Sequence, residues 1–443
     1  MEGKMISRRK FIGAAAVGAA GFAIASTAKS YARILGANDL VTFAIAGLHG
    51  RGYAHLSSIK ANESAAHISH VCDVDSRYLD KFAGEAQNEL GYLPVKEKDF
   101  RKILESKDVD VLTVAAPDHW HTPMAILAMQ AGKHVYVEKP CSHNFNESGM
   151  LLQAQRKYAK LLQMGNQQRS SPHTIEIIQQ IHDGLIGRPY FAKCWYSNAR
   201  KSIGVGKAVP VPDYLDWELW QGPAPRRQYK DNIHPYNWHW FWLYGTGEAL
   251  NNGTHELDVC RWALDAGFPK SVTSSGGRYQ FHDDWEFYDT LVTSFEYDDQ
   301  MITWEGMSCN GKKYYNRGRG STIHGTKGTV LIDRDGYQVF SLDDKLINEF
   351  KVGGSSSTDD LLSRDSMTDA HFRNMINAVR TGEKLHAPVA DAYISVAMLQ
   401  FSNIAWKLNR ELKLDVNDGH IVGDSEATKM CGRDYEKGWE IHG

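Results

Sequence analysis

A short glycine-rich stretch of the sequence has the composition and spacing of an anion-binding turn. In "FAIAGLHGRGYAHL", Gly47, Gly50 and Gly52 follow an apolar run and precede a helical pattern. Glycines let the backbone approach a pyrophosphate, and the free N–H groups of a helix N-terminus favour its negative charge. His49 stands where the strict pattern has a further glycine, and Arg51 lies in the same turn. These five residues predict one side of a dinucleotide site.

An acidic residue closes the next predicted strand. Asp73 ends "HISHVCDVD", about twenty residues after the glycine turn, where a carboxylate holds ribose hydroxyls. A carboxylate also repels a 2′-phosphate, so NAD is favoured over NADP, although Arg77 nearby softens that preference. The alternative is that Asp73 only caps the start of the following helix.

A third group of polar residues follows the ends of later strands. Lys139 stands in "VYVEKP", between an acid and a proline that fixes the turn, unlike a lysine on an ordinary solvated loop. Ligands of open parallel sheets bind beyond the carboxyl ends of the strands. The residues predicted along this crevice are Pro117, His121, Glu138, Lys139, Pro140 and Gln167.

An alternation of strands and helices must bring these residues together. Residues 41–46 form an apolar run without alternation, which is typical of a buried parallel strand. Further strands are predicted over residues 109–116 and 134–137, with a helix from about residue 122 to residue 131 that ends before Gly132. The alternation predicts an α/β fold with an N-terminal Rossmann domain, a doubly wound parallel sheet, over residues 36–165.

The second part of the chain, residues 166–443, has a different pattern. Five of the thirteen prolines fall between Pro210 and Pro235, which predicts a long irregular loop of the kind that often carries function. Strand-like runs from "SVTSSGGRY" to "GYQVFSL" predict a large, mostly antiparallel open sheet with one covered face. Amphipathic helices are expected near residues 371–381 and 391–409, in an α+β domain whose last helices can pack back on the first domain.

The first 35 residues read as an export signal. Arg8 and Arg9 precede an uncharged run of mostly Ala and Gly, and small residues follow as far as Ala32. "SRRKF" matches the twin-arginine pattern, so we expect a periplasmic or otherwise exported protein that uses the twin-arginine machinery. An ordinary Sec signal or an anchor is the alternative. The twin-arginine route carries folded proteins, so a cofactor can be bound before export.

Composition narrows the classes of partner. The net charge is −3, which gives no sign of a nucleic-acid or anionic-membrane surface. The six cysteines are scattered without a C-x-x-C pair, so we expect neither a disulfide framework nor a zinc site. The spacing of His119, His121 and His239 matches no metal-ligand signature, and no metal is expected.

"VYVEKP" after "APDHWH", together with the glycine turn, resembles the Gfo/Idh/MocA oxidoreductase family, which includes glucose–fructose oxidoreductase and inositol dehydrogenase. The resemblance extends from about Val41 to the C-terminal helices. It implies NAD as the cofactor, a small carbohydrate as the substrate and a homo-oligomer, dimer or tetramer, paired through the C-terminal sheet. It also implies that Lys139 lies between nicotinamide and substrate and stabilises the developing alkoxide.

Members of this family carry an H-E-x-x-D element opposite the lysine, which is "HELD" here. The resemblance implies that His255 is the general base, a task that suits an imidazole near neutral pH. Related dehydrogenases have an aspartate four residues earlier, but this chain has Asn251, whose amide cannot stabilise an imidazolium by charge. Asp258, on the same helical face, is then expected to substitute, or His255 mainly positions substrate. A purely structural helix histidine is the alternative.

An unusually aromatic run, "YNWHWFW", has two interpretations. It is either a core strand or a set of rings for stacking on a sugar. Both hold if alternate side chains point to opposite sides. The residues expected to contact substrate are Tyr236, Trp238, His239 and Trp240.

Three functions follow in order of preference. The first is an oxidoreductase acting on a hydroxyl of a sugar or glycoside, with tightly bound NAD that a second sugar or keto acceptor reoxidises. The second is a redox-neutral enzyme that cleaves glycosides by oxidation, elimination and reduction. The third is a non-catalytic NAD- or sugar-binding protein. The departures at His49 and Asn251 favour this third function, whereas the presence of both Lys139 and His255 argues against it.

Overall fold

The computed structural model describes residues 40–353 and 366–441. The signal peptide predicted over residues 1–35 therefore lies outside the described residues. Within the described ranges, no helix combines the length and the apolar character that a membrane span requires.

The first sheet has six parallel strands in the order β3-β2-β1-β4-β5-β6. Its strands are β1 (Val41–Ala46), β2 (Ala66–Cys72), β3 (Val95–Glu97), β4 (Val111–Val114), β5 (His134–Val137) and β6 (Leu162–Met164). The helices of this part are α2 (Gly50–Ala61), α3 (Ser76–Leu90), α4 (Phe100–Glu105), α5 (Asp118–Gln130) and α6 (Phe145–Tyr158). The predicted Rossmann sheet is confirmed, and α5 begins four residues earlier than expected, directly after the Pro117 turn.

The second sheet has nine strands in the order β14-β13-β12-β11-β7-β10-β9-β8-β15, and only β7 and β10 pair in parallel. Its strands are β7 (Pro189–Ser197), β8 (Ser271–Gly277), β9 (Thr290–Glu296), β10 (Met301–Met307), β11 (Arg319–Gly325), β12 (Thr329–Asp333), β13 (Gly336–Phe340), β14 (Leu346–Lys351) and β15 (Leu412–Lys413). The remaining helices are α7 (Pro172–His182), α8 (Trp217–Gln221), α9 (Thr254–Ala263), α10 (Ser366–Thr381), α11 (Val389–Leu408) and α12 (Ser425–Lys429). The mostly antiparallel open sheet is thus confirmed.

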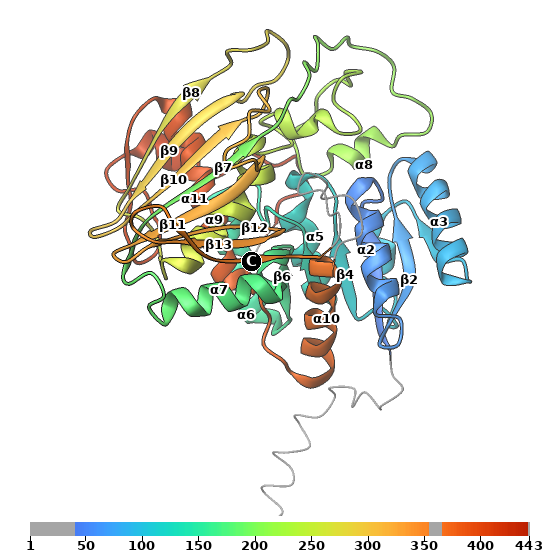
Figure 1. Ribbon diagram of the computed structural model, residues 1–443. Helices are drawn as coiled ribbons and strands as arrows, with labels where there is room; N and C mark the ends of the chain where they lie inside the picture. The colour runs from blue at the N-terminus through green and yellow to red at the C-terminus, as the bar shows by residue number, and fades with distance from the viewer. Residues whose placement is uncertain (1–39, 354–365, 442–443) are drawn as a thin grey trace, which may run out of the picture. The chain divides into compact units, whose positions relative to one another are not determined.

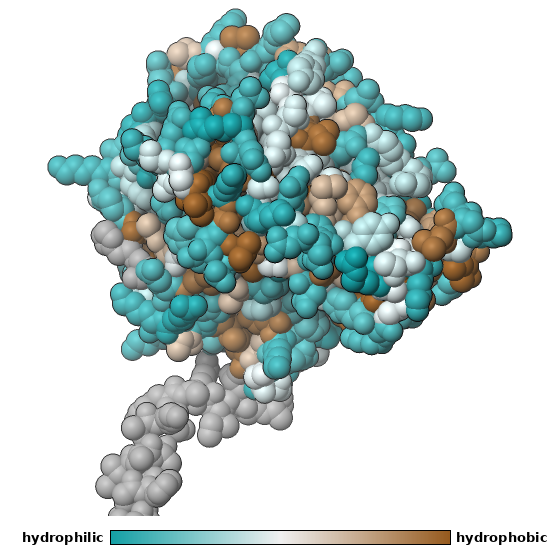
Figure 2. All heavy atoms as spheres, turned by 90° about the vertical axis from the view of Figure 1, so that its left-hand side faces the viewer, coloured by the Kyte–Doolittle hydropathy of each residue, from teal (hydrophilic) through white to brown (hydrophobic). Residues whose placement is uncertain are grey.

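Helices cover one face of the second sheet (Figure 1). Helix α9 packs on β7, β10 and β11, α11 packs on β8, and α7 packs on β13. Accordingly, burial alternates along β9 and β10, because successive side chains point to opposite faces. Figure 2 shows one side of the molecule, where hydrophobic side chains form several small groups among hydrophilic ones, as is ordinary for a folded protein.

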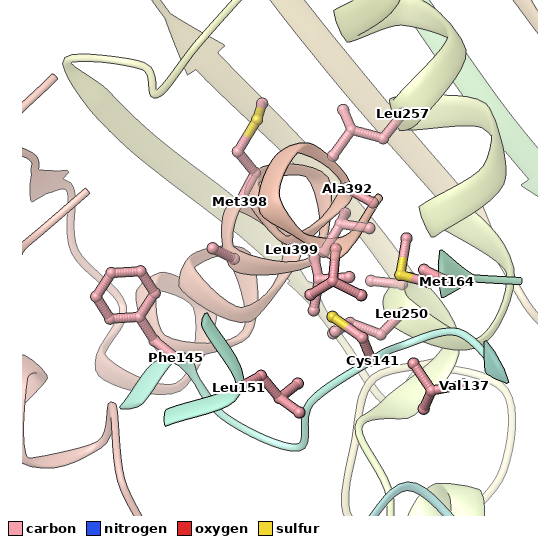
Figure 3. Close-up of a cluster of buried hydrophobic side chains, with 14 of the residues drawn as sticks. Val137, Cys141, Phe145, Leu151, Met164, Leu250, Leu257, Ala392, Met398 and Leu399 are labelled. Atoms are coloured by element: carbon pink, nitrogen blue, oxygen red, sulfur yellow. The ribbon is translucent and has the colours of Figure 1, made fainter. Parts of the chain in front are cut away.

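The C-terminal helices tie the two sheets together. Figure 3 shows α11 beside Val137 at the end of β5 and Cys141 just after it, and beside Leu250 and Leu257, which belong to the π-helical turn Ala249–Gly253 and to α9. Helix α10 packs on α2 and β1, and its Phe372 stacks on Tyr136 at 4.5 Å between ring centroids. One continuous core therefore holds the end of β5, which carries Lys139, against the turn that carries Asn251.

The aromatic run does not form a strand, so that interpretation is wrong. Asn237–Trp240 is a short 3₁₀ helix. The chain then folds back, and a β-carbon at Gly245 would lie 2.5 Å from the backbone of His239. This close return excludes an extended strand. The proline-rich segment before it is mostly irregular, as predicted, apart from the single turn-and-a-half of α8.

Candidate active site

One cleft gathers most of the predicted site residues at the carboxyl ends of β1, β2, β4 and β5. The predicted residues that line it are Gly47, His49, Gly50, Arg51, Asp73, Pro117, His121, Glu138, Lys139, Gln167, Tyr236, Trp238, His239, Asn251 and His255. Gly52, Pro140, Asp258 and Trp240 lie outside this lining. Strand ends, the proline-rich segment and the start of α9 thus converge on one space.

The glycine turn leaves room that only glycine provides. Gly47 has φ of +93°, and a β-carbon there would lie 2.4 Å from the carbonyl oxygen of Ala115 on the neighbouring strand end. A β-carbon at Gly52 would lie 2.5 Å from the carbonyl oxygen of Gly47, so Gly52 serves the packing of helix on strand. Helix α2 starts with no side-chain cap and no acidic residue in its first turn. The backbone N–H groups of this turn therefore suit a pyrophosphate.

Asp73 is held by the backbone at the end of β2. Its Oδ2 accepts a hydrogen bond from the amide of Leu48 at 2.8 Å, and its Oδ1 accepts one from the amide of Asp75 at 2.9 Å. Burial raises the pKa of Asp73 to about 6, and these two hydrogen bonds oppose that rise. Asp75, and not Asp73, caps α3. The remaining lone pairs of Asp73 can accept hydrogen bonds from a ligand.

The Lys139 ammonium lies at the centre of the site. Its Nζ donates to the backbone carbonyl oxygen of Asn251 at 2.5 Å and to the side-chain oxygen of the same residue at 3.2 Å. Burial lowers the pKa of Lys139 to about 8, although the Glu138 and Asp118 carboxylates act in the opposite direction. An ammonium has three donors, so one remains for a ligand after the two bonds to Asn251.

Glu138, next to Lys139, belongs to a buried ion cluster. Its Oε1 accepts hydrogen bonds from Arg51 Nε at 2.8 Å and from His55 Nε2 at 2.9 Å. Burial alone would raise the pKa of Glu138, but the charge of Arg51 and the bond from His55 hold it below its usual range. Arg51 therefore fixes the end of β5. His121 has a similar role, because its ring nitrogens lie 2.6 and 2.7 Å from the carbonyl oxygens of Pro140 and Ala116.

Two of the histidines that line the cleft, His239 and His255, differ in their hydrogen bonding. His239 Nδ1 donates to the carbonyl oxygen of Tyr236 at 2.6 Å, and its ring stacks on Trp238 with centroids 3.6 Å apart. His255 Nδ1 is buried and has no hydrogen-bond partner. Burial and nearby cations hold the pKa of both rings well below the usual value, so both are neutral. Only His239 has its tautomer fixed, with Nε2 as the acceptor.

Asp258 does not orient His255, and this expectation is wrong. Its carboxylate accepts hydrogen bonds from Arg169 at 2.6 and 3.0 Å and from the Ser395 hydroxyl at 2.7 Å. Burial would raise the pKa of Asp258, but the charge of Arg169 lowers it overall. Asp258 lies about one helical turn after His255 in α9. However, Arg169, which belongs to another segment, determines where the Asp258 side chain points.

We expect Asp258→Asn to lower the free energy of unfolding by about 2 kcal/mol, because it removes the closest carboxylate of the buried Arg169 guanidinium and leaves only the contact with Asp391 Oδ2 at 3.3 Å. Denaturant unfolding followed by circular dichroism measures the change. The control is Asp299→Asn, which removes an exposed pair with Arg188 and should leave stability nearly unchanged. Unaltered stability in Asp258→Asn would contradict the structural role.

The sequence predicts that Trp240 contacts substrate, but this residue does not line the cleft. It is buried and stacks on Trp285, with centroids 3.9 Å apart and an interplanar angle of 15°. It packs away from the cleft because the 3₁₀ turn directs Trp238 and Trp240 to different neighbours. Tyr236 and Trp238 do reach the cleft.

Several lining residues escaped the sequence analysis. Tyr196 is the second-last residue of β7, and Asn198 and Arg200 follow at every second position after it; Arg200 Nε pairs with Glu248 at 2.5 Å. Glu248 also accepts hydrogen bonds from Asn251 and Asn252, and so holds the π-helical turn Ala249–Gly253. Alternating polar residues after the "CWYS" strand were the available signal.

Over residues 40–353 and 366–441, no group of three or more His, Cys, Asp or Glu is arranged for a metal ion.

Arg77 is the cation near Asp73 that could weaken a preference for NAD over NADP. Arg77 Nη2 lies 2.8 Å from Asp75 Oδ2, and its guanidinium packs on the Tyr214 ring at 3.3 Å from the centroid. Arg77 is thus held by Asp75 and Tyr214. Tyr78 and His234 complete this end of the cleft.

Comparisons with known proteins agree with the geometry. Residues 41–166 match the oxidoreductase family with an NAD-binding Rossmann fold, and residues 195–441 match the C-terminal α/β domain of the same family. A glycosyl hydrolase family 109 protein of Saccharopolyspora erythraea is 35% identical over 161 residues, which cover 35% of this chain and 34% of that protein. An inositol 2-dehydrogenase of Salmonella paratyphi B is 26% identical over 201 residues, 44% of this chain and 53% of that enzyme. The chain spans about a third of the length of the first curated relatives it matches.

Solved structures share the fold. A levoglucosan dehydrogenase in complex with NADH and levoglucosan superposes with a TM-score of 0.65 at 18% identity, over 85% of this chain and all of that one. The WlbA dehydrogenase of Bordetella pertussis, in complex with NADH and UDP-GlcNAcA, gives a TM-score of 0.61 at 19% identity, over 85% of this chain and 99% of that one. The two family matches and this fold show that the chain belongs to the Gfo/Idh/MocA oxidoreductase family, whose N-terminal domain is an NAD-binding Rossmann fold.

Proposed function

We propose that the protein is an NAD-dependent oxidoreductase that acts on a hydroxyl of a sugar or glycoside. The observation that carries this proposal is the Lys139 ammonium, anchored by Asn251 with one donor free, in a cleft that also presents His239 and Trp238. Relatives named as inositol and levoglucosan dehydrogenases support a polyhydroxylated substrate.

The residues of the cleft suit NAD. The uncapped start of α2 and the backbone at Gly47 would hold the pyrophosphate, and Asp73 would hold the ribose hydroxyls. We expect a preference for NAD over NADP, because the carboxylate that would hold the ribose hydroxyls would repel a 2′-phosphate, and Arg77 is held by Asp75. When bound, NAD supplies the hydride acceptor for the oxidised carbon.

The side chains divide the proton chemistry. The free donor of Lys139 would bind the substrate hydroxyl oxygen and stabilise the negative charge that develops there. Nε2 of His239, whose other nitrogen is bound to Tyr236, would accept the hydroxyl proton. His255 would contact substrate, since no partner fixes its tautomer. The family-based role of His255 as base thus passes to His239 in this proposal.

The pKa of Lys139 predicts the upper limit of the pH profile. The ammonium is present below about pH 8 and is lost above it, so sugar oxidation should fall by up to tenfold per pH unit on the alkaline side. No inflection is expected near pH 6.5, because both histidines are already neutral there. Initial rates at low sugar concentration and saturating NAD across the pH range test this. A rate that keeps rising through pH 8 would show that the neutral amine is the active form.

Asp73 predicts the pH dependence of cofactor binding. A carboxylate accepts hydrogen bonds from both ribose hydroxyls only when ionised, so NAD affinity should rise as pH increases through about 6. Asp73→Asn should weaken binding roughly tenfold or more at neutral pH and remove this dependence. Titration calorimetry measures both effects, with the exposed Asp108→Asn as control. An unchanged pH dependence in Asp73→Asn would assign it to another group.

The amino-terminal sequence suggests where the cofactor binds and how it is reoxidised, and we include both in the proposal. A protein that is folded around NAD and exported by the twin-arginine route would keep its cofactor, because free NAD is scarce outside the cytoplasm. A bound sugar or keto acceptor would then restore the oxidised form within the site. Replacing Arg8 and Arg9 with lysine should hold the protein in the cytoplasm, as measured by cell fractionation.

The exposed face of the second sheet is proposed as the contact of a dimer or tetramer, which sedimentation would measure.

A second candidate function follows from the relatives named as glycosyl hydrolase family 109 proteins. In a redox-neutral cycle a sugar carbon is oxidised, the acidified neighbouring C–H loses its proton, and the glycosidic bond is eliminated. Water then adds to the unsaturated ketone, and the carbonyl is reduced again. The same Lys139 and His239 would serve these steps.

One experiment separates these candidates. The purified mature protein is dialysed exhaustively, its nucleotide content is measured, and a panel of sugars and glycosides is added. Retained NAD that becomes reduced with a sugar supports the oxidoreductase. Release of the aglycone without net reduction supports glycoside cleavage. If the bound NAD is never reduced and no aglycone is released with any compound, only a binding function would remain.

A further inference from the structure

A second cavity of about 280 Å³ lies apart from the active-site cleft and shares no lining residue with it. Its walls come from the start of α6, from α11, from the segment 242–246 and from the C-terminal residues 430–434. Between the two spaces, the Thr246 hydroxyl on the cavity side donates to Asp118 on the cleft side at 2.6 Å.

Three side chains from different elements line this cavity and each has a polar atom without a hydrogen-bond partner: Asn144 Nδ2, Gln400 Oε1 and Arg433 Nη1. Both ring nitrogens of His143, which also lines the cavity, lack a partner as well. Asn144 is 7% exposed, Gln400 is 5% exposed, and the Arg433 side chain is 9% exposed. A buried polar group without a partner is costly, so these atoms call for a polar occupant.

The same three side chains are fixed through their other atoms. Asn144 Oδ1 accepts a hydrogen bond from the Glu147 amide, and Gln400 Nε2 donates to the Ser142 carbonyl oxygen at 3.0 Å. Arg433 Nε donates to the Glu147 carboxylate at 2.7 Å. The unpartnered donors and acceptor are therefore held in a defined arrangement before any ligand arrives.

The charges around the cavity favour a neutral ligand. Glu147 neutralises Arg433, and the exposed Arg227 and Asp434 at the mouth carry opposite signs. Burial, together with Arg433, holds the pKa of His143 well below its usual value, so this lining ring is uncharged.

Aromatic side chains form another wall. Trp242 and Phe287 stack with centroids 4.8 Å apart and an interplanar angle of 16°, and Phe145 lines the cavity beside them. A sugar ring matches this combination, because it has apolar C–H faces and hydroxyls that both donate and accept hydrogen bonds. The volume lies just below the range of about 300–1,000 Å³ typical of larger ligands, which suits a single ring.

We propose that this cavity is a second binding site that takes one neutral monosaccharide unit. The exposed residues at its mouth, Arg227 and Asp434, open it to solvent, so the sugar enters independently of the cleft. The site goes beyond the proposed function, and its occupation requires neither NAD nor Lys139.

The test uses the full mature chain carrying Lys139→Met, so that no turnover disturbs the titration. Glucose, galactose and N-acetylglucosamine are titrated by calorimetry. We expect two equivalents of at least one sugar per chain, and only one after Trp242→Ala or after Gln400→Leu. Tyr279→Ala, which removes a 70% exposed ring outside the cavity lining, should leave both equivalents. Thermal unfolding confirms that each variant is folded.

A stoichiometry that neither Trp242→Ala nor Gln400→Leu changes would overturn the proposal. Crystals soaked with the same sugar give the second readout: density for a ring against Trp242 is expected, and ordered water alone in the cavity would refute the site. If no sugar reduces the cofactor bound to the parent protein, which keeps Lys139, the proposed function fails, whereas the loss of one equivalent in the Trp242 variant still supports this site.

Discussion

Lys139→Met should lower turnover roughly 10³-fold while leaving NAD bound. The ammonium is buried and held by the two oxygens of Asn251, so its free donor points to a fixed position in the cleft. Such a preorganised donor acts mainly on the charge that develops in the transition state. Methionine has a similar length but offers no donor. The loss should therefore appear in kcat more than in KM.

Single-turnover reduction of bound NAD and direct measurement of bound nucleotide separate the two effects. Lys133→Met is a matched control, because Lys133 is also a buried lysine but donates to the Ser106 carbonyl oxygen outside the cleft. The control should keep its turnover. If Lys139→Met turns over at the parental rate, the ammonium is not part of the chemistry; if it loses NAD, the lysine mainly shapes the cofactor site.

The parts of the site that the sequence predicts are those determined by local patterns. The glycine turn, Asp73 and Lys139 each follow a strand, and parallel strands end at one edge of a sheet. The fold class follows from the same alternation. Each of these residues could therefore be placed in the cleft from its position relative to a predicted strand, without knowledge of distant contacts.

The errors occur where distant segments decide the direction of a side chain. Asp258 lies one turn from His255, yet Arg169, 89 positions earlier in the chain, draws its carboxylate away. Trp240 lies two residues from Trp238, yet it packs on Trp285 from a separate loop. No periodicity in the sequence contains these partners, because they meet only after the chain has folded.

The π-helical turn is a further feature that local patterns do not reveal. Asn251 presents its backbone and side-chain oxygens together to Lys139, while Glu248 restrains the turn from the other side and is itself paired with Arg200. A π-helical turn often marks a functional site. An aspartate at position 251 would add a negative charge beside Lys139. The asparagine gives the lysine two acceptors without that charge, which is consistent with its lowered pKa.

His239→Gln should lower kcat about 10²- to 10³-fold, more than His255→Gln, for which we expect a loss of roughly tenfold expressed mainly in KM. The difference rests on the hydrogen bond from His239 Nδ1 to Tyr236, which leaves Nε2 as an acceptor facing the cleft. Glutamine can keep the bond to Tyr236 but cannot take a proton. Nδ1 of His255 has no such bond, and burial, followed by the charges of Arg334 and Arg319, holds the pKa of this ring well below its usual value.

Steady-state kinetics of both variants with the same substrate, at a pH below 8 where Lys139 stays charged, measures this difference. Imidazole added to a His239→Gly variant should restore part of the rate, because a free base can occupy the space beside Trp238, whereas imidazole should not act on His255→Gly. A structural role for His239 would give no such rescue. If His255→Gln instead shows the larger loss in kcat and imidazole restores only His255→Gly, then His255 accepts the proton as the family resemblance implies, and the fixed tautomer of His239 serves only to bind the sugar.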